Sequence, residues 1–354
     1  MGKKSIYAVA AALSLFSAQA SAQTPDLSLP EGLRFEGPSM PVPVGAGVAF
    51  RAGVNYPWNN YGWDFGANAW GHHGVSDPEN RAQVAADFSK FKSLGVRTVR
   101  WFLLGDGRAA PEFDAQGLVT GLDEYFFPDM DAALEIAQQN DIQLVIVLMD
   151  FELFGHPKAL NGVTMGGHPA IANDPKVRQS FYDKALLPIL DRYGAHPAIL
   201  AWEVANEPEI KLGLAGSDSI RRRMVKTPVM QSLVTEVVSF IHSHTKHFAT
   251  LGSHNRTLLP LWRKAGLDFY QFHYYGYMAL TAPLNIRYEK LGLDKPCVLG
   301  EFPTKFTTRS IDSYLDVMLG NGFAGAWAWS YKATDRFSDF AAQADKFADW
   351  VKKH

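Results

Sequence analysis

Eight short runs of mainly apolar residues recur along residues 46–354, and stretches of helical character separate them. Strand-like runs that alternate with helices predict a parallel sheet, and eight such repeats predict that the sheet closes. We therefore predict an α/β fold, a (β/α)8 TIM barrel that forms a single domain over residues 46–354. The expected strands are Ala52–Tyr56, Thr98–Leu104, Gln143–Met149, Ile199–Ala205, Phe248–Gly252, Asp268–Tyr274, Cys297–Gly300 and Gly325–Ser330.

Two of the intervening segments carry clear helix signals. Residues 80–94 place apolar side chains at helical spacing, and Gly95 predicts the end of that helix. Asp174 followed by Pro175 predicts a helix that reaches about Tyr193, because Asp caps helices well and Pro suits their first position. The stretch 212–227 follows the fourth expected strand and carries Arg221, Arg222 and Arg223, so we expect a solvated excursion of the fourth loop.

The N-terminal residues have the pattern of a secretory signal peptide. Lys3 and Lys4 precede an apolar stretch over residues 6–16, and residues 20–22 are small. This order predicts cleavage after Ala22 and a secreted or periplasmic protein. Residues 23–45 are then an N-terminal lead segment, rich in proline and glycine, which we expect to wrap the outside of the barrel.

Composition narrows the classes of partner. The 354 residues are 47% hydrophobic and 20% charged, as expected of one large globular domain. Loss of residues 1–22 lowers the basic count from 34 to 32 against 36 acidic residues, a net charge of −4. This mild acidity argues against nucleic acid or an anionic membrane as the main partner, and we expect a monomer. The single cysteine, Cys297, cannot form an internal disulfide, so the core must hold the fold.

Two of the expected strands lead directly into a glutamate. Glu207 follows Asn206 at the end of the fourth run, and Glu301 follows Gly300 in the seventh. The C-terminal ends of barrel strands form the mouth where barrel enzymes do chemistry. Two carboxyl groups there suit cleavage of a glycosidic bond, because one can protonate the departing oxygen while the other attacks the anomeric carbon. We expect no cofactor and no metal.

The segment Trp202-Glu-Val-Ala-Asn-Glu-Pro208 resembles the fourth-strand motif of clan A glycoside hydrolases. Family 5, which holds cellulases and mannanases, is the family it resembles best, and the resemblance covers most of residues 46–354. It implies that Glu207 is the general acid/base and Glu301 the nucleophile. Many family members carry a histidine at the end of the third strand, where this chain has Met149-Asp150. Because of that departure, the resemblance does not identify the subfamily or its substrate.

The same resemblance implies further substrate-binding residues. His273 and Tyr275 match the sixth-strand His-x-Tyr that lies near the nucleophile. Trp329 matches the eighth-strand tryptophan that floors the subsite of the sugar being cleaved, with Trp327 as the alternative. Arg100 matches the second-strand arginine that steadies the nucleophile.

Physical reasoning adds content to these assignments. A retaining enzyme needs carboxyl groups about 5–5.5 Å apart, whereas an inverting enzyme leaves about 6.5–9.5 Å for a water. The acid needs a raised pKa, while the nucleophile must stay ionised beside donors such as Arg100. The amide of Asn206 could hydrogen-bond the 2-hydroxyl of the sugar. Strand alternation places Glu203 deeper in the barrel, where we expect a structural role with Arg100 as its counter-ion.

Aromatic residues after the first strand suggest a glycan cleft. Trp58, Trp63 and Trp70 lie in a long segment at the expected catalytic face, where indole rings stack well on sugars. Packing of that loop onto the barrel explains each of them equally well, and the same holds for Trp262 and Tyr277. Trp350 is expected to pack the last helix.

Other polar clusters offer alternatives. Asp150 and Glu152, at the end of the third strand, could bind sugar or a cation, and we favour sugar. His72 and His73, and the set His242, His244 and His247, have no acidic residue at recognised metal-ligand spacing. The second set is expected to be a solvated face.

Together these features predict a secreted retaining β-glycoside hydrolase that acts by double displacement. An open, aromatic cleft without a basic cluster favours endo-cleavage of a neutral β-linked polysaccharide. The resemblance puts β-1,4-mannan or glucan first and β-1,3-glucan next. A transglycosylase, an exo-β-glycosidase of the same fold and a non-catalytic carbohydrate-binding barrel remain open.

Overall fold

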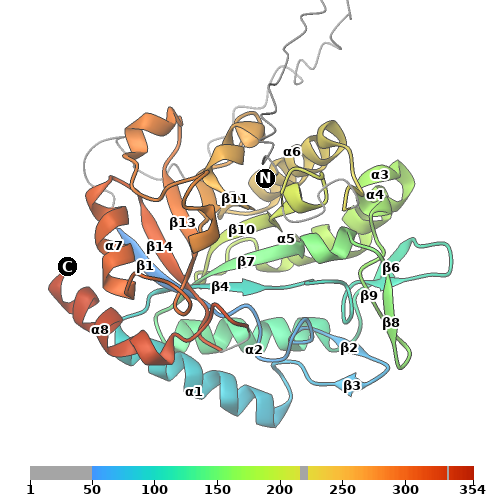
Figure 1. The fold of residues 1–354 in the computed structure, drawn as a ribbon. Helices are drawn as coiled ribbons and strands as arrows, with labels where there is room; N and C mark the ends of the chain where they lie inside the picture. The colour runs from blue at the N-terminus through green and yellow to red at the C-terminus, as the bar shows by residue number, and fades with distance from the viewer. Residues whose placement is uncertain (1–49, 216–221, 333–334) are drawn as a thin grey trace, which may run out of the picture. The chain divides into compact units, whose positions relative to one another are not determined.

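The computed structural model describes residues 50–215, 222–332 and 335–354. Eight parallel strands close into a barrel in the order β1-β14-β13-β12-β11-β10-β7-β4, which confirms the predicted fold (Figure 1). The expected signal peptide and lead segment lie outside the described residues. The barrel strands are β1 (Arg51–Asn55), β4 (Thr98–Phe102), β7 (Gln143–Asp150), β10 (Ile199–Asn206), β11 (Phe248–Ser253), β12 (Tyr270–His273), β13 (Cys297–Pro303) and β14 (Gly325–Trp329).

Helices follow most of the strands, and the two with clear sequence signals are present, although α1 begins at Pro78 and not at residue 80. The side chain of Asp77 caps α1, which ends at Gly95 in the left-handed conformation. Asp174 caps α4, which continues through a π-helical turn, Tyr182–Leu186, into α5 and so reaches Tyr193. The α-helices are α1 (Pro78–Leu94), α2 (Phe126–Gln139), α3 (Ala170–Asn173), α4 (Pro175–Phe181), α5 (Leu187–Tyr193), α6 (Thr227–His244), α7 (Ile311–Gly320) and α8 (Ala344–Lys353).

The alternation of strand and α-helix is interrupted after β11 and β12. Only the 3-10 helix η4 (Arg256–Trp262) joins β11 to β12, and Pro260 lies inside it. The connection from β12 to β13 holds two short 3-10 helices, η5 (Gly276–Met278) and η6 (Tyr288–Leu291). The expectation of a helix after every strand is therefore wrong at these two places. In the first, Pro260 removes a backbone donor that an α-helix needs.

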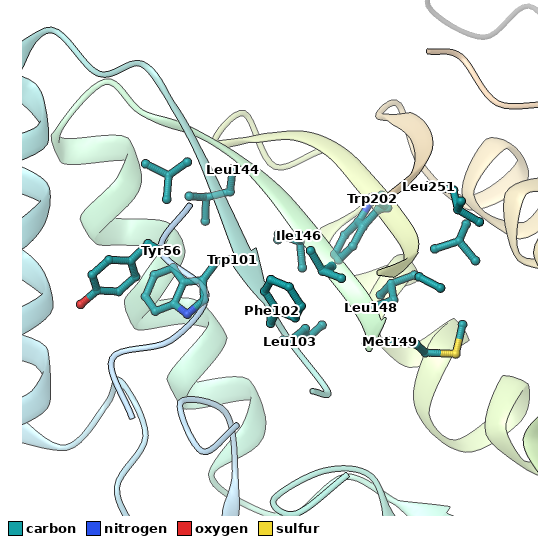
Figure 2. Packing of buried hydrophobic residues seen from close by; sticks show 14 of the residues in the cluster. Tyr56, Trp101, Phe102, Leu103, Leu144, Ile146, Leu148, Met149, Trp202 and Leu251 are labelled. Carbon is teal, nitrogen blue, oxygen red and sulfur yellow. The ribbon is translucent and has the colours of Figure 1, made fainter. Parts of the chain in front are cut away.

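The outer faces of the strands pack against the helices in one large apolar cluster. Figure 2 shows Leu144, Ile146 and Leu148 of β7 in this cluster. Tyr56 and Trp101 meet there edge to face, with ring centroids 5.0 Å apart. Full burial of each large aliphatic side chain stabilises the fold by about 1.5–3 kcal/mol, so this layer supplies the main stabilising term.

The barrel interior has an apolar layer at one end and a charged layer above it. Trp327 packs with Val145, Phe269 and Val298 in the apolar layer. Arg100 and Glu203 are fully buried in the charged layer. A Cβ at position 252 would lie 2.4 Å from an oxygen of Glu203, so Gly252 makes room for this ion pair.

Three two-stranded hairpins extend the loops: β2 (Ala67–Asn68) with β3 (Gly71–His72), β5 (Glu112–Phe113) with β6 (Val119–Gly121), and β8 (Lys158–Leu160) with β9 (Val163–Met165). The excursion after β10 is only partly solvated. Arg222 and Arg223 are exposed, but Leu212 and Val225 are buried, and Arg221 lies outside the described residues. Among the described helices, we find none with the length and apolarity that a membrane crossing requires.

Candidate active site

A cavity of about 300 Å³ opens at the C-terminal ends of the strands. Seven of the predicted site residues line it: Trp58, Asp150, Asn206, Glu207, Tyr275, Glu301 and Trp329. They come from loops and strand ends that are distant in sequence, and closure of the barrel is what brings them together.

Glu207 and Glu301 face each other across this cavity. One carboxyl oxygen of each lies within 4.8 Å of the other, and both side chains are buried. This separation fits the about 5–5.5 Å of a retaining pair and is too short for the water that an inverting pair needs. Glu207 follows β10 with φ 43° and ψ 45°, in the left-handed region that costs an L-residue roughly 1–2 kcal/mol.

Two donors hold the carboxylate of Glu301. Nη1 of Arg100 donates to Oε1 over 2.7 Å, and the hydroxyl of Tyr275 donates to Oε2 over 2.6 Å. Burial raises the pKa of Glu301, and the nearby charge of Glu207 adds to that rise. His273, Arg100 and the Tyr275 hydroxyl oppose it.

Two imidazoles approach the carboxylate of Glu207. Nδ1 of His273 lies 2.8 Å from Oε1, and Nδ1 of His254 lies 3.2 Å from Oε2. Burial alone would raise the pKa of Glu207, but His254 and His273 together outweigh it and lower that pKa to about 2. The ligand-free site therefore favours a carboxylate at Glu207, the reverse of what a proton donor needs.

Sequence reasoning missed His254. It directly follows Ser253, the last residue of β11. The same rule that pointed to the two glutamates, a polar side chain at the C-terminal end of a barrel strand, could have found it.

A chain of hydrogen bonds connects the charged layer to the cavity. Nε and Nη2 of Arg100 each donate to Glu203 over 2.6 Å, which confirms the expected counter-ion. Nη2 also donates to Oδ1 of Asn206 over 2.8 Å, and Nδ2 of Asn206 donates to Asp150 over 2.7 Å. One amide hydrogen of Asn206 therefore has no partner among the residues that the structure describes and is available to a ligand.

The register of β10 explains how Glu203 and Asn206 both reach Arg100. Strict alternation would place residues three apart on opposite faces. The pairing of β10 with β11 shifts between Glu203 and Asn206, and this irregularity turns Asn206 inward.

Of the two eighth-strand tryptophans, Trp329 is the one placed to floor the sugar subsite. Trp329 lines the cavity, and its indole N–H donates to Asp335 over 2.9 Å. Trp327 packs in the apolar layer of the barrel interior, away from the cavity.

No protein-family model matches this chain. A mannan endo-1,4-beta-mannosidase of Mytilus edulis is 27% identical over 322 residues, 79% of this chain and 83% of the relative. One from Cryptopygus antarcticus is 26% identical over 336 residues, 83% of this chain and 84% of the relative. Among solved structures, the endo-1,4-beta-mannanase from Eisenia fetida superposes with a TM-score of 0.71 at 26% identity, covering 84% of this chain and 90% of that one.

The chain is a glycoside hydrolase, as its resemblance to clan A predicts. Its similarity to the solved beta-mannanase of Mytilus edulis extends over 86% of this chain and 92% of that one, with 25% identity and a TM-score of 0.71. A similarity of this extent includes most of the barrel.

Three candidate aromatic contacts of this glycoside hydrolase lie elsewhere. Trp63 does not line the cavity, and its ring packs edge to face on Trp70 at 5.3 Å. The indole of Trp70 donates to the backbone of Asn161, which ties this loop to the β8–β9 turn. Trp262 is buried and donates to Glu209. For these three residues the loop- and core-packing alternative holds.

The described residues contain one group whose spacing would suit a cation, formed by Glu207, His273 and Glu301. The guanidinium of Arg100 already contacts Glu301 and supplies a positive charge there. His72 pairs with Asp129 and His244 with Asp191, whereas His247 is buried and accepts from the indole N–H of Trp202. The expectation of a solvated face is therefore wrong for His247.

Glu152 and Tyr277, which the sequence offered as possible sugar contacts, also line the cavity. The other lining residues could not be singled out from the sequence: Tyr61, Gly62, Phe102, Gly105, Asp106, Phe151, Asp335 and Phe337. Among the described residues, the lining contains six acidic side chains and neither lysine nor arginine. Such a cavity repels anionic sugars.

Proposed function

We propose that this chain is a retaining endo-β-1,4-mannanase, with Glu301 as nucleophile and Glu207 as general acid/base. The two carboxyl groups lie within 4.8 Å of each other at the mouth of the barrel, and this separation is the observation that supports a retaining mechanism. The substrate follows from relatives described as mannan endo-1,4-beta-mannosidases, which align over about four-fifths of the chain.

The first step forms a covalent glycosyl-enzyme. A carboxylate oxygen of Glu301 attacks the anomeric carbon, the bond to the departing sugar oxygen breaks, and Glu207 gives its proton to that oxygen. Arg100 and Tyr275 orient Glu301 through their hydrogen bonds. The free N–H of Asn206 donates to the 2-hydroxyl, and Trp329 lies beneath the ring.

The second step releases the product. Glu207, now a carboxylate, takes a proton from water as that water attacks the anomeric carbon, and the bond to Glu301 breaks. Two successive displacements restore the original configuration. Both glutamates return to the state in which they began.

The lining of the cavity supports a neutral, polymeric substrate. Its carboxyl groups disfavour uronic acids, and no basic side chain lines it. Trp58, Tyr277 and Phe337 extend the aromatic surface beyond Trp329, so more than one sugar ring can stack. Asp150 lies beside Asn206 and is proposed to bind a sugar hydroxyl rather than a cation.

The surroundings of the enzyme are proposed from its sequence. The charged, apolar and small residues of positions 1–22 favour secretion or export to the periplasm. The mild net acidity gives no surface for nucleic acid, and we propose a monomer.

Product analysis tests the substrate and the mode of attack together. Purified protein is incubated with mannan, β-1,4-glucan, β-1,3-glucan and xylan, with Glu301→Ala as the inactive control. We expect mannan to be cleaved fastest and to give a mixture of oligosaccharides early in digestion. Mannose as the only early product would contradict endo-attack, and longer products than the starting chains would identify a transglycosylase.

A further inference from the structure

Both oxygens of Glu207 meet an imidazole, but the two histidines are in different surroundings. His273 is fully buried on β12, and its Nε2 has no hydrogen-bond partner among the described residues. Its Nδ1 lies 2.8 Å from Oε1 of Glu207, where an N–H can donate.

His254 lies at the edge of the same site and keeps some exposure, 9% of its surface. Its Nδ1 is buried, makes no well-aligned hydrogen bond and lies 3.2 Å from Oε2 of Glu207. Its backbone N–H donates to Oε2 of Glu209, and Ser253 and Trp262 hold Glu209 in turn. The hydrogen bond from its backbone therefore positions His254, and Nδ1 of its ring faces Glu207.

The charged groups that act on His254 are all carboxylates. Glu207 after β10, Glu209 in η3 (Pro208–Ile210) and Glu301 on β13 each favour its protonated form. Burial opposes this effect, and the net result is a raised pKa for His254. The ligand-free site therefore favours an imidazolium at His254, 3.2 Å from a carboxylate at Glu207.

We propose that His254 stores the proton that Glu207 later gives to the leaving group. The inference rests on the proposed acid/base role of Glu207. When sugar rings fill the cavity, water leaves, and a buried ion pair becomes less favourable than its neutral counterpart. The proton then moves from Nδ1 of His254 to Oε2 of Glu207, leaving a neutral imidazole and a carboxylic acid.

The proton balance closes over one catalytic cycle. Glu207 passes the stored proton to the departing oxygen as Glu301 forms its bond to the sugar. In the second step Glu207 takes a proton from the attacking water and, once product leaves and water returns, hands it back to His254. His254 is thus a positioning residue that acts through Glu207 and does not touch the reacting atoms.

The test uses His254→Asn, because asparagine keeps an N–H donor but cannot titrate. With the store removed, the basic limb of the pH profile of kcat/KM on mannan should move to lower pH by roughly one unit or more. The ratio of kcat/KM for mannan to that for a dinitrophenyl mannooligosaccharide, whose leaving group needs no proton, should fall roughly tenfold or more. His244→Asn on the outer helix α6, whose ring pairs with Asp191, is the matched control.

The outcomes separate this inference from the proposed function. A parallel loss at every pH and on both substrates would mean that His254 is only structural, and would overturn the storage role. Failure of the wild type on mannan would instead refute the substrate. For that case the imidazole is titrated directly by ¹⁵N NMR: its midpoint should fall in Glu207→Gln, and an unchanged midpoint would overturn the proposal.

Discussion

The guanidinium of Arg100 holds the carboxylate of Glu203 through two hydrogen bonds of 2.6 Å, with both side chains fully buried. The same guanidinium reaches Glu301 and Asn206. One cation therefore neutralises a structural carboxylate and orients two residues of the site. Loss of Arg100 should affect stability and activity by separable routes.

Arg100→Met is expected to destabilise the protein by about 3–5 kcal/mol, because a buried carboxylate loses its partner. The double variant Arg100→Met/Glu203→Leu should recover much of that stability, since the fully buried Glu203 carboxylate is gone, but not the activity, because Glu301 still lacks its partner. Urea unfolding and mannan hydrolysis measure the two effects. Arg192→Met, at an exposed pair with Asp131, is the control and should cost at most about 1 kcal/mol. Equal stability losses at the two sites would contradict the argument.

Glu301→Ala should lower turnover by more than roughly a thousandfold, because the nucleophile is gone. Azide is small enough to enter the vacated space and should restore turnover of an activated glycoside, with a glycosyl azide of inverted configuration as product. Glu207→Ala is the comparison, and azide there should give the retained configuration. The product is identified by proton NMR. The nucleophile lies elsewhere if Glu301→Ala keeps ordinary activity.

The two tryptophans of the first loop should behave differently. Trp58 lines the cavity, whereas Trp63 packs on Trp70 outside it. Trp58→Ala should raise KM for mannooligosaccharides roughly tenfold, equivalent to about 1.4 kcal/mol of lost stacking. Trp63→Ala should lower the melting temperature and leave KM nearly unchanged. Steady-state kinetics and thermal unfolding of both variants check this, and a raised KM for Trp63→Ala would return that residue to the binding surface.

Asp150 should make stability depend on pH. Burial raises its pKa to about 7, although the backbone N–H of Glu152 and the amide of Asn206 oppose that rise. The folded state then holds a proton that the unfolded state, with a pKa of about 3.9, has already lost. Its contribution is fully present below about pH 4 and is lost as pH rises through 7.

The stability difference between wild type and Asp150→Asn should therefore shrink from about pH 4 to about pH 8, because asparagine does not titrate. Urea unfolding across this range measures it. Asp141→Asn is the control: its exposed carboxyl has a lowered pKa through Lys92, so its contribution should stay flat there. A difference that grows with pH would show an ionised Asp150 in the folded protein.

The sequence was sufficient for the barrel because a strand buried on both faces leaves a continuous apolar run that few other elements produce. It was also sufficient to bring Glu207, Glu301 and Arg100 together, since closure places all strand ends at one mouth. It missed the 3-10 connections after β11 and β12, because the even repeat of strands masked the local effect of Pro260. Tertiary packing, which no local pattern encodes, decided between Trp327 and Trp329.

The site residues were harder to predict where a side chain suited both sugar binding and packing. The indole rings of Trp63 and Trp262 could each stack on a sugar. In the structure, Trp63 instead packs on Trp70 within its loop, and Trp262 donates a hydrogen bond to Glu209. His254 was overlooked because the strand before it ends in Gly252 and Ser253 and lacks the terminal carboxylate that marked the other two strands. Its partner, Glu207, becomes adjacent only when β10 and β11 pair.

The left-handed backbone of Glu207 has an evolutionary consequence. Glycine adopts such a conformation freely and asparagine tolerates it, whereas glutamate does so at an energetic cost. A lineage released from selection for hydrolysis would gain stability by exchanging this residue, so drift would reinforce the loss of activity instead of reversing it. Glu207 therefore occupies a position whose backbone conformation favours a different residue.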